Sequence, residues 1–218
     1  MRTIAVLLAW LPLASAQNML PVSSTPAPVV TGHEDLIEKV MGIVSPSESG
    51  ELTQKKRFHL YLFSVVGPVP VLAEIAGAGV GQWQDRPKEW GQGWGAFAER
   101  AESNLAYNGI RQTITYGTSM LFHEDNRYFA SHKRGVWART SYAVRSTVTA
   151  RHPDGNEAFS ISSVTGVVGA SALASTWGPR SWEGAEGIGM NAGISFALTA
   201  AFNIVREFLP DIMGRPQN

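Results

Sequence analysis

The chain of 218 residues contains no cysteine. Disulfide bonds and thiolate metal sites are therefore excluded, and the folded chain has to be stable through its packed core alone. Acidic and basic residues are equal in number, 18 of each, so the whole chain carries no net charge that would attract a polyanion. Nucleic acid is accordingly not among the expected partners.

Charged residues are also missing from two long stretches, residues 158–177 and 187–205. Both consist largely of Gly, Ala, Ser and Val, and each is long enough to cross a bilayer as a helix. Their Ser, Thr and Asn residues lower the hydrophobicity, which makes membrane insertion marginal. Two interpretations stay open: closely packed buried helices, or weakly hydrophobic membrane segments.

The start of the chain has the pattern of a secretory signal peptide. Arg2 gives a basic start, residues 4–13 an apolar core, and Ala14-Ser15-Ala16 a small-x-small cleavage site. We therefore expect an exported protein of the cell envelope, in the periplasm or associated with the outer membrane. The expected organisation is a signal peptide (1–16), a disordered leader (17–32), a short amphipathic helix and linker (33–50), a helical domain (51–212) and a tail (213–218).

Glycine and proline divide the remaining chain into helical segments. The pair Gly67-Pro68 predicts a kink in the first helix, and residues 152–156 (His-Pro-Asp-Gly-Asn) form the strongest turn signal. Period-two alternation is rare, so we predict an all-α fold, a bundle of about four to six helices. The expected helices cover residues 52–83, 94–123, 138–150 (where β-branched residues leave a strand open), 158–177 and 187–210, with Pro210 closing the last.

Small residues recur at four-residue spacing in three of these helices, which predicts closely packed interfaces. Glycine costs roughly 1 kcal/mol relative to alanine inside a helix, so such ridges need a packing reason. We therefore expect that leucine at Gly166 and at Gly193 would disrupt folding or assembly while leaving export intact. The ridges are Ala73, Gly77 and Gly81; Ser162, Gly166, Ala170 and Ala174; and Gly189, Gly193, Ala197 and Ala201.

An internal duplication is also suggested. A small-residue ridge, a tryptophan, a proline turn, a second tryptophan and a further helix occur in that order twice, around Trp83 to Trp90 and around Trp177 to Trp182. This order predicts two pseudo-repeated helical hairpins. Glycine-rich helices resemble one another by composition, so chance similarity is the alternative.

The sequence contains features for and against membrane insertion. Six tryptophans lie at expected helix ends, where they form either an interfacial aromatic belt or caps on a glycine-rich core. Glu74 and Arg111 lie inside long helices and would be costly in lipid unless paired. We favour a soluble or peripheral bundle that contacts a membrane, an envelope protein or a second copy of itself. A membrane hairpin formed by residues 158–177 and 187–205 is the alternative.

The densest polar cluster contains the candidate catalytic residues His123, Glu124, Asp125 and Arg127. A histidine with two carboxylates can act as general acid and base. Adjacent helical residues point about 100° apart, however, so Glu124 and Asp125 cannot both share a face with His123. A helix end with an arginine–carboxylate pair is the favoured interpretation of the cluster.

No cofactor or metal site is predicted. Residues 187–192 fit a dinucleotide-binding glycine pattern only formally, because no strand precedes them. Position 127, where a two-histidine zinc motif needs its second histidine, is arginine.

Five segments of the chain are distinctive in combination: residues 89–93 (EWGQG), 108–114 (NGIRQTI), 124–129 (EDNRYF), 175–177 (STW) and 202–211 (FNIVREFLPD). Together they resemble a family of exported hypothetical proteins from soil bacteria of the acidobacterial type. The resemblance covers roughly residues 55–212, and Asn126 stands where that family has proline. It implies a single exported domain and no particular activity, so it assigns no site residue.

The leading hypothesis from the sequence is an exported helical protein of the cell envelope with a structural or interaction role. The alternative is an envelope hydrolase that uses the acid–base cluster from His123 to Arg127.

Overall fold

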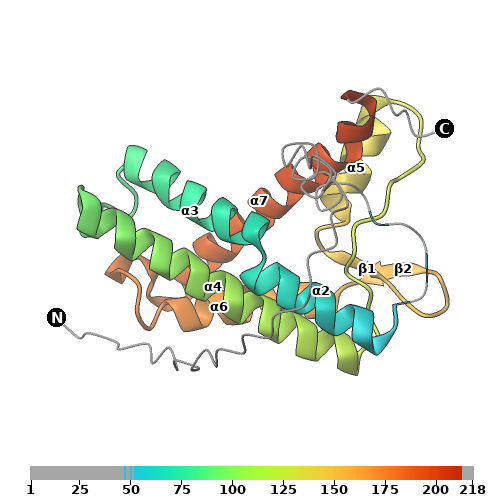
Figure 1. Ribbon diagram of the computed structural model, residues 1–218, viewed down its shortest axis with the longest axis horizontal. Helices are drawn as coiled ribbons and strands as arrows, with labels where there is room; N and C mark the ends of the chain where they lie inside the picture. The colour runs from blue at the N-terminus through green and yellow to red at the C-terminus, as the bar shows by residue number, and fades with distance from the viewer. Residues whose placement is uncertain (1–46, 48–49, 51, 213–218) are drawn as a thin grey trace, which may run out of the picture.

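The computed structural model describes residue 47, residue 50 and residues 52–212. The predicted signal peptide, leader and tail lie outside the described residues, as does all of the predicted helix and linker at 33–50 except positions 47 and 50. The described chain is mostly helical with one small hairpin of strands (Figure 1), so the all-α prediction is confirmed.

The helices are α2 (Gln54–Val66), α3 (Pro68–Trp83), α4 (Trp94–Leu121), α5 (Val136–Arg145), α6 (Ile161–Ala174) and α7 (Gly184–Ile212). Two short 3-10 turns, η1 (Lys88–Trp90) and η2 (Arg180–Trp182), precede α4 and α7. The strands β1 (Thr149–Arg151) and β2 (Glu157–Phe159) pair antiparallel, with Thr149 opposite Phe159.

Local sequence explains where several helices begin. The Thr53 hydroxyl accepts a hydrogen bond from the Lys56 amide at 3.3 Å and caps α2. Gly67 ends α2, and Pro68 begins α3 because proline lacks the amide hydrogen that a first helical turn leaves unused. The predicted break at Gly67-Pro68 is confirmed.

Three boundaries differ from the sequence prediction. The helix expected over 138–150 ends at Arg145, and the chain then enters β1. Strands of three residues are too short to show the alternation of apolar and polar residues that predicts a strand, so the sequence did not predict them. The turn between them was predicted. Pro210 lies inside α7, which continues to Ile212. Within the uncharged stretch 158–177, only the 14 residues of α6 are helical.

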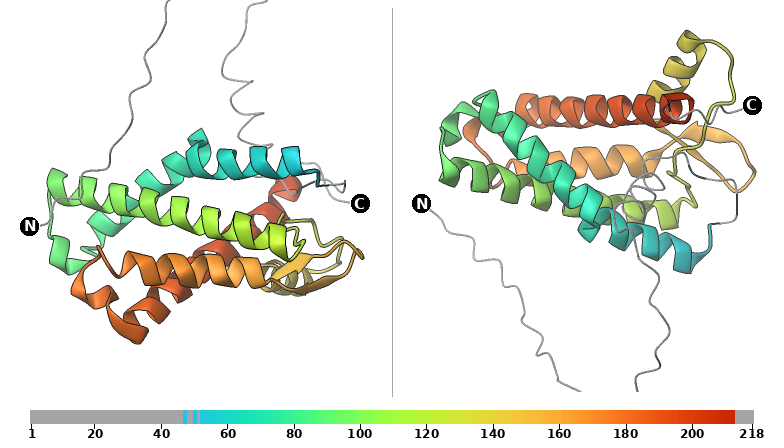
Figure 2. Two further views of the ribbon diagram at one scale, coloured as in Figure 1. Left: turned by 90° about the horizontal axis from the view of Figure 1, so that it is seen from below. Right: turned by 45° about the horizontal axis from the view of Figure 1, so that its top comes forward.

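The helices form the predicted bundle, arranged as an open row of neighbours. Helix α4 packs against α2 and α3 on one side and against α6 on the other, and α6 in turn packs against α7. Figure 2 shows α4 running between α2 and α6. An open row leaves the outer faces of its helices without protein neighbours within the described chain.

The row has two distinct ends (Figure 1). The α3–α4 and α6–α7 connections, residues 83–94 and 177–184, lie together at one end, which we call the tryptophan end. The start of α2, residues 122–160 and the last turns of α7 lie at the other, which we call the hairpin end.

The repeated motif of the sequence forms similar structures in its two copies. Residues 87–90 (Pro-Lys-Glu-Trp) and 179–182 (Pro-Arg-Ser-Trp) each form a 3-10 turn between two helices. The corresponding rings of Trp90 and Trp182 contact each other edge to face, with centroids 5.4 Å apart. The packing itself is not symmetric, because the extensive α4–α6 contact has no counterpart between α3 and α7 in the described chain.

The distribution of side chains between interior and surface is inverted relative to a soluble protein. Seven of the ten buried apolar residues in the described chain are alanine, and no leucine, isoleucine, methionine or tryptophan there is buried. Arginine, glutamate, asparagine and serine are buried instead, among them Arg100, Asn108, Glu124 and Glu207. A soluble protein of this size buries its large aliphatic side chains first.

Two helical segments of the described chain are long and apolar enough to cross a membrane: residues 54–83, which include the Gly67 kink, and α7. In their most apolar windows only 6% and 17% of residues are buried. The core helix of a soluble protein would be mostly buried there. This pair differs from the predicted hairpin, because α6, at about 21 Å, is shorter than the roughly 30 Å hydrocarbon core of a bilayer.

Candidate functional site: a polar interior

A line of polar residues at four-residue spacing follows the inner face of α7. We call Asn191, Ser195, Thr199, Asn203 and Glu207 the polar stripe. Ser195, Asn203 and Glu207 are buried, and the other two are half-buried. The opposite face carries exposed Met190, Ile194, Leu198, Phe202 and Val205, of which Leu198 is 68% exposed.

The middle of the polar stripe contacts the charged residue at the centre of α4. Arg111 Nη1 donates to the Thr199 hydroxyl at 3.3 Å and to the Ser195 hydroxyl at 3.5 Å. Glu74 of α3 is near enough to interact electrostatically with Arg111. Arg111, one of the two charges that would be costly in lipid unless paired, is therefore hydrogen-bonded to polar side chains of α7, and Glu74 is near enough to feel its charge.

The end of the polar stripe anchors the hairpin end of the molecule. The Glu207 carboxylate accepts hydrogen bonds from the Tyr128 hydroxyl at 2.6 Å, the Ser131 amide at 3.1 Å and Arg139 Nε at 3.0 Å. It also accepts one from the Ser131 hydroxyl, and Arg139 forms a second ion pair with Asp211. One fully buried carboxylate thus joins α7, α5 and the 128–131 segment.

A second buried carboxylate, Glu124, caps α6. It accepts hydrogen bonds from the Ile161 amide at 2.8 Å, the Ser162 amide at 2.9 Å and the Ser160 hydroxyl at 2.9 Å, and also from the Ser162 hydroxyl. A carboxylate at a helix N-terminus satisfies free amides and interacts favourably with the helix dipole. Arg57 of α2 completes the junction by donating to the Glu124 carbonyl oxygen at 2.6 Å.

These contacts alter the acidities of the groups at the hairpin end. Burial alone would raise the pKa of Glu124, but the hydrogen bonds from Ser162, Ile161 and Ser160 outweigh it and hold the pKa below its usual 4.5. Burial and the hydrogen bond to Glu157 raise the pKa of Tyr142 to about 12. Burial and Glu207 likewise raise the pKa of Tyr128. These groups are held in one protonation state near neutral pH, which suits anchoring rather than proton transfer.

The candidate catalytic residues do not converge. His123 lies two residues beyond the end of α4 with a positive φ of 54°, and its side chain is exposed. Glu124 is directed into the α6 N-terminus, whereas Asp125 forms an ion pair with Arg127 at 2.6 Å. No hydrogen bond or ion pair within residues 52–212 joins His123 to the other three. The predicted arginine–carboxylate pair is confirmed. The four residues of the cluster make separate contacts and do not form one site.

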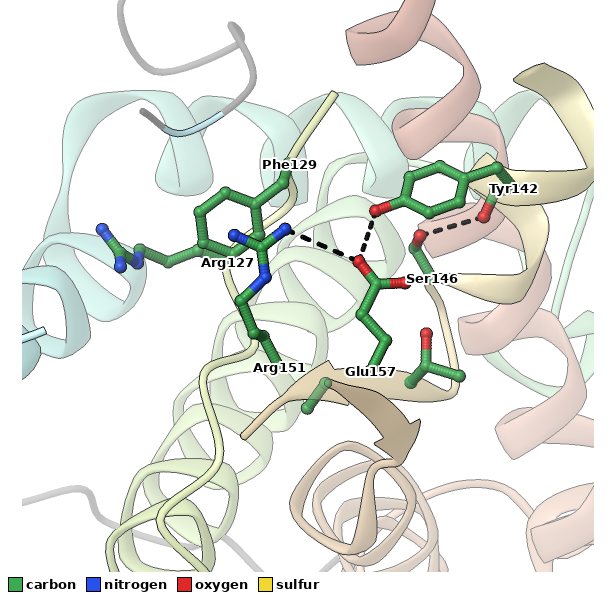
Figure 3. A pocket seen from close by; sticks show the side chains of 8 residues that line it. Arg127, Phe129, Tyr142, Ser146, Arg151 and Glu157 are labelled. Carbon is green, nitrogen blue, oxygen red and sulfur yellow. Dashed lines mark hydrogen bonds and ion pairs between the residues drawn. The ribbon is translucent and has the colours of Figure 1, made fainter. Parts of the chain in front are cut away.

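A small cavity lies beside this cluster (Figure 3). Arg127 and Arg151 approach the Phe129 ring, with guanidinium carbons 5.2 and 3.9 Å from its centroid. The Tyr142 hydroxyl donates to Glu157 at 2.6 Å across the cavity, which Ser146, Thr149 and Ala150 complete. Its volume of about 10 Å³ holds roughly one water molecule, so it has no room for a substrate.

A larger hollow of about 500 Å³ is open to the surface and lined by residues of the α2 region alone. It includes His59 and does not adjoin Arg111, Glu74 or the cluster at 123–127. Among the described residues, no group of three histidine, aspartate or glutamate side chains is placed to hold a metal ion.

Sequence reasoning missed the polar stripe, although its signal was available. Five polar residues at four-residue intervals from Asn191 to Glu207 lie on one face of any helix. The small-residue ridge of the same helix, from Gly189 to Ala201, instead predicts a packed interface on another face. Comparison with models of protein families, with curated proteins and with solved structures found no match for the chain.

Proposed function

We propose that the chain is an exported cell-envelope protein whose helical row is embedded in a membrane, and that its role is structural or one of interaction rather than catalytic. The observation that carries this proposal is the inverted distribution of side chains. Water-facing large apolar side chains and a polar interior are costly in water, whereas lipid accommodates both.

The exposed apolar side chains of α7 give the strongest support to this proposal. Six large apolar side chains of this helix are exposed, Met190, Ile194, Leu198, Phe202, Val205 and Ile212. Their transfer from water to lipid is worth roughly 5–10 kcal/mol, since each is only partly exposed. The helix has 29 residues and a length of about 43 Å, which exceeds the roughly 30 Å hydrocarbon core.

Arg111 and Arg100, two charged groups within the row, are compatible with this environment because they face protein. Arg111 is directed toward Ser195 and Thr199 of α7, and Arg100 is 2% exposed with hydrogen bonds to the Gln82 side chain and to three carbonyl oxygens. Charged residues of membrane-embedded helices occupy such interior positions.

Several tryptophans support the same orientation. Trp83 and Trp94 at the tryptophan end and Trp137 at the hairpin end are 83%, 87% and 87% exposed. Exposed indoles at both ends of long apolar helices match the two interfacial regions of a bilayer. If these tryptophans instead capped the core of a soluble protein, the core would cover their side chains.

Carbonate extraction of separated envelope membranes tests the proposal. We expect the chain to stay in the membrane pellet at high pH, because the embedded area is large. Release into the supernatant would contradict membrane embedding and would favour a water-soluble assembly in which the apolar faces pack against protein. The same fractionation shows which envelope membrane contains the chain.

A further inference from the structure

We propose that the hairpin end of the molecule binds the headgroups of anionic phospholipids through a patch formed by Lys133, Arg134 and Trp137. This inference rests on the proposed membrane embedding and adds the lipid class and the end of the molecule that recognises it. We call these three residues the basic patch.

The basic patch lies where α7 ends. Arg139 of α5 forms ion pairs with Glu207 and Asp211 in the last two turns of α7, which fixes the start of α5 beside the end of that helix. Figure 1 shows the two helices side by side at this end. Residues just before α5 are thereby held at the level where a membrane-spanning α7 would leave the hydrocarbon core.

The cations of the basic patch are available to a ligand. Lys133 and Arg134 are exposed, and no ion pair within residues 52–212 involves either. The Lys133 ammonium lies 5.2 Å from the Tyr142 ring centroid, which places the charge without neutralising it.

Apolar groups stand directly beside these cations. Val136 is 67% exposed and Trp137 is 87% exposed. An indole next to two cations suits the boundary between acyl chains and phosphate groups. Nucleic acid would make use of the cations but not of the exposed valine.

The two ends of the molecule differ in charge. Among the described residues of the hairpin end, five exposed cations (Lys55, Lys56, Lys133, Arg134 and Arg145) stand against two exposed carboxylates, Asp154 and Asp211. At the tryptophan end and in the first three turns of α4, three exposed cations (Arg86, Lys88 and Arg180) stand against five exposed carboxylates, Glu89, Glu99, Glu102, Glu183 and Glu186. Although the whole chain has no net charge, the described residues of the hairpin end therefore carry an excess of exposed cations, which suits anionic lipid.

The test uses the detergent-solubilised full chain, titrated with a soluble short-chain phosphatidylglycerol and separately with the matching phosphatidylcholine. Calorimetry gives each affinity. We expect tighter binding of phosphatidylglycerol, weakened about 25-fold in the Lys133→Gln/Arg134→Gln variant, or about fivefold for each cation. Trp137→Ala should weaken the binding of both lipids, because the indole contacts the acyl region.

Two matched controls come from the opposite end. Lys88→Gln/Arg180→Gln removes two equally exposed cations, and Trp94→Ala removes an equally exposed indole; both variants should bind phosphatidylglycerol as the parent does. Equal affinity for the two lipids, or equal losses in the two charge variants, would overturn the proposal. Equally tight binding of free glycerol 3-phosphate would also overturn it, by showing a site for the phosphate alone.

Carbonate extraction separates this inference from the membrane proposal. The Lys133→Gln/Arg134→Gln variant should stay in the pellet like the parent, since its apolar faces are intact. Release of the parent itself would instead count against membrane embedding, whatever the lipid titrations show.

Discussion

Helices α6 and α7 have similar compositions and opposite surroundings. Both are rich in small residues and carry a ridge of them at four-residue spacing. In α6 every member of the ridge, from Ser162 to Ala174, is buried. In α7 the ridge from Gly189 to Ala201 is exposed, and the polar stripe faces inward.

The comparison shows what a small-residue ridge does and does not specify. It permits close approach of another backbone but does not choose which face of a helix will be covered. In α7 that choice follows the groups that most need protein partners, from Asn191 to Glu207. In the membrane that we propose, apolar side chains gain nothing by burial against protein, so polar residues would determine the inner face.

The largest expected contrast comes from the same substitution in the two ridges. A side chain at Gly166 would collide with the Thr115 side chain and lie about 3.1 Å from the Arg111 carbonyl oxygen. At Gly193 nothing in the described chain lies within 4 Å. Gly166→Leu should cost more than about 3 kcal/mol or prevent folding, whereas Gly193→Leu should change stability by less than about 1 kcal/mol.

Thermal unfolding of both variants in one detergent measures this contrast. The sequence predicts disruption of folding or assembly at both positions. Because the α7 ridge is not an interface within the described chain, we expect folding to tolerate the change at Gly193. Similar losses in the two variants would show that the outer face of α7 does pack against protein.

A second contrast concerns the end of the polar stripe. Glu207→Ala leaves Arg139, Tyr128 and Ser131 without their shared partner in a buried site, and should cost about 3–5 kcal/mol. Asp211→Ala removes the exposed partner of the same arginine and should cost about 1 kcal/mol or less. Equal effects would mean that Glu207 is not the anchor of the hairpin end.

A smaller effect is expected at the cap of α6. Glu124→Gln keeps the side-chain shape but removes the charge, which should cost about 2 kcal/mol at neutral pH. Because folding lowers the pKa of Glu124, its carboxylate stabilises the fold above the usual value of about 4.5, and that contribution is lost as the pH falls through the folded-state value.

The stability of the parent should therefore decline on acidification more steeply than that of Glu124→Gln. Unfolding midpoints measured from pH 7 down to about pH 3 compare the two chains. Parallel curves would exclude Glu124 as a titrating anchor.

Much of the fold followed from local signals in the sequence. The kink at Gly67-Pro68, the start of α4 after Gly93 and the turn at residues 152–156 all depend on residues adjacent in the chain. Such signals give helix positions and an all-α class. They contain no information on which helix lies beside which.

The site was harder to predict from the sequence because its contacts join residues far apart in the chain. Glu124 meets Ser160 and Ser162 across more than 30 positions, and Tyr128 meets Glu207 across 79. Grouping by sequence proximity placed Glu124 with His123, whereas folding separates them. Only the four-residue spacing of the polar stripe is a local signal for the inner face of α7, and the sequence prediction did not include it.

The absence of cysteine allows a direct test of the outer face of α7. Single cysteines at Leu198, which is 68% exposed at mid-helix, and at exposed Glu102 are treated with a water-soluble maleimide in envelope membranes broken open so that both sides are accessible. We predict that Leu198→Cys reacts only after detergent dissolves the membrane, while Glu102→Cys reacts at once. Equal and immediate labelling of both would contradict the membrane-embedded account.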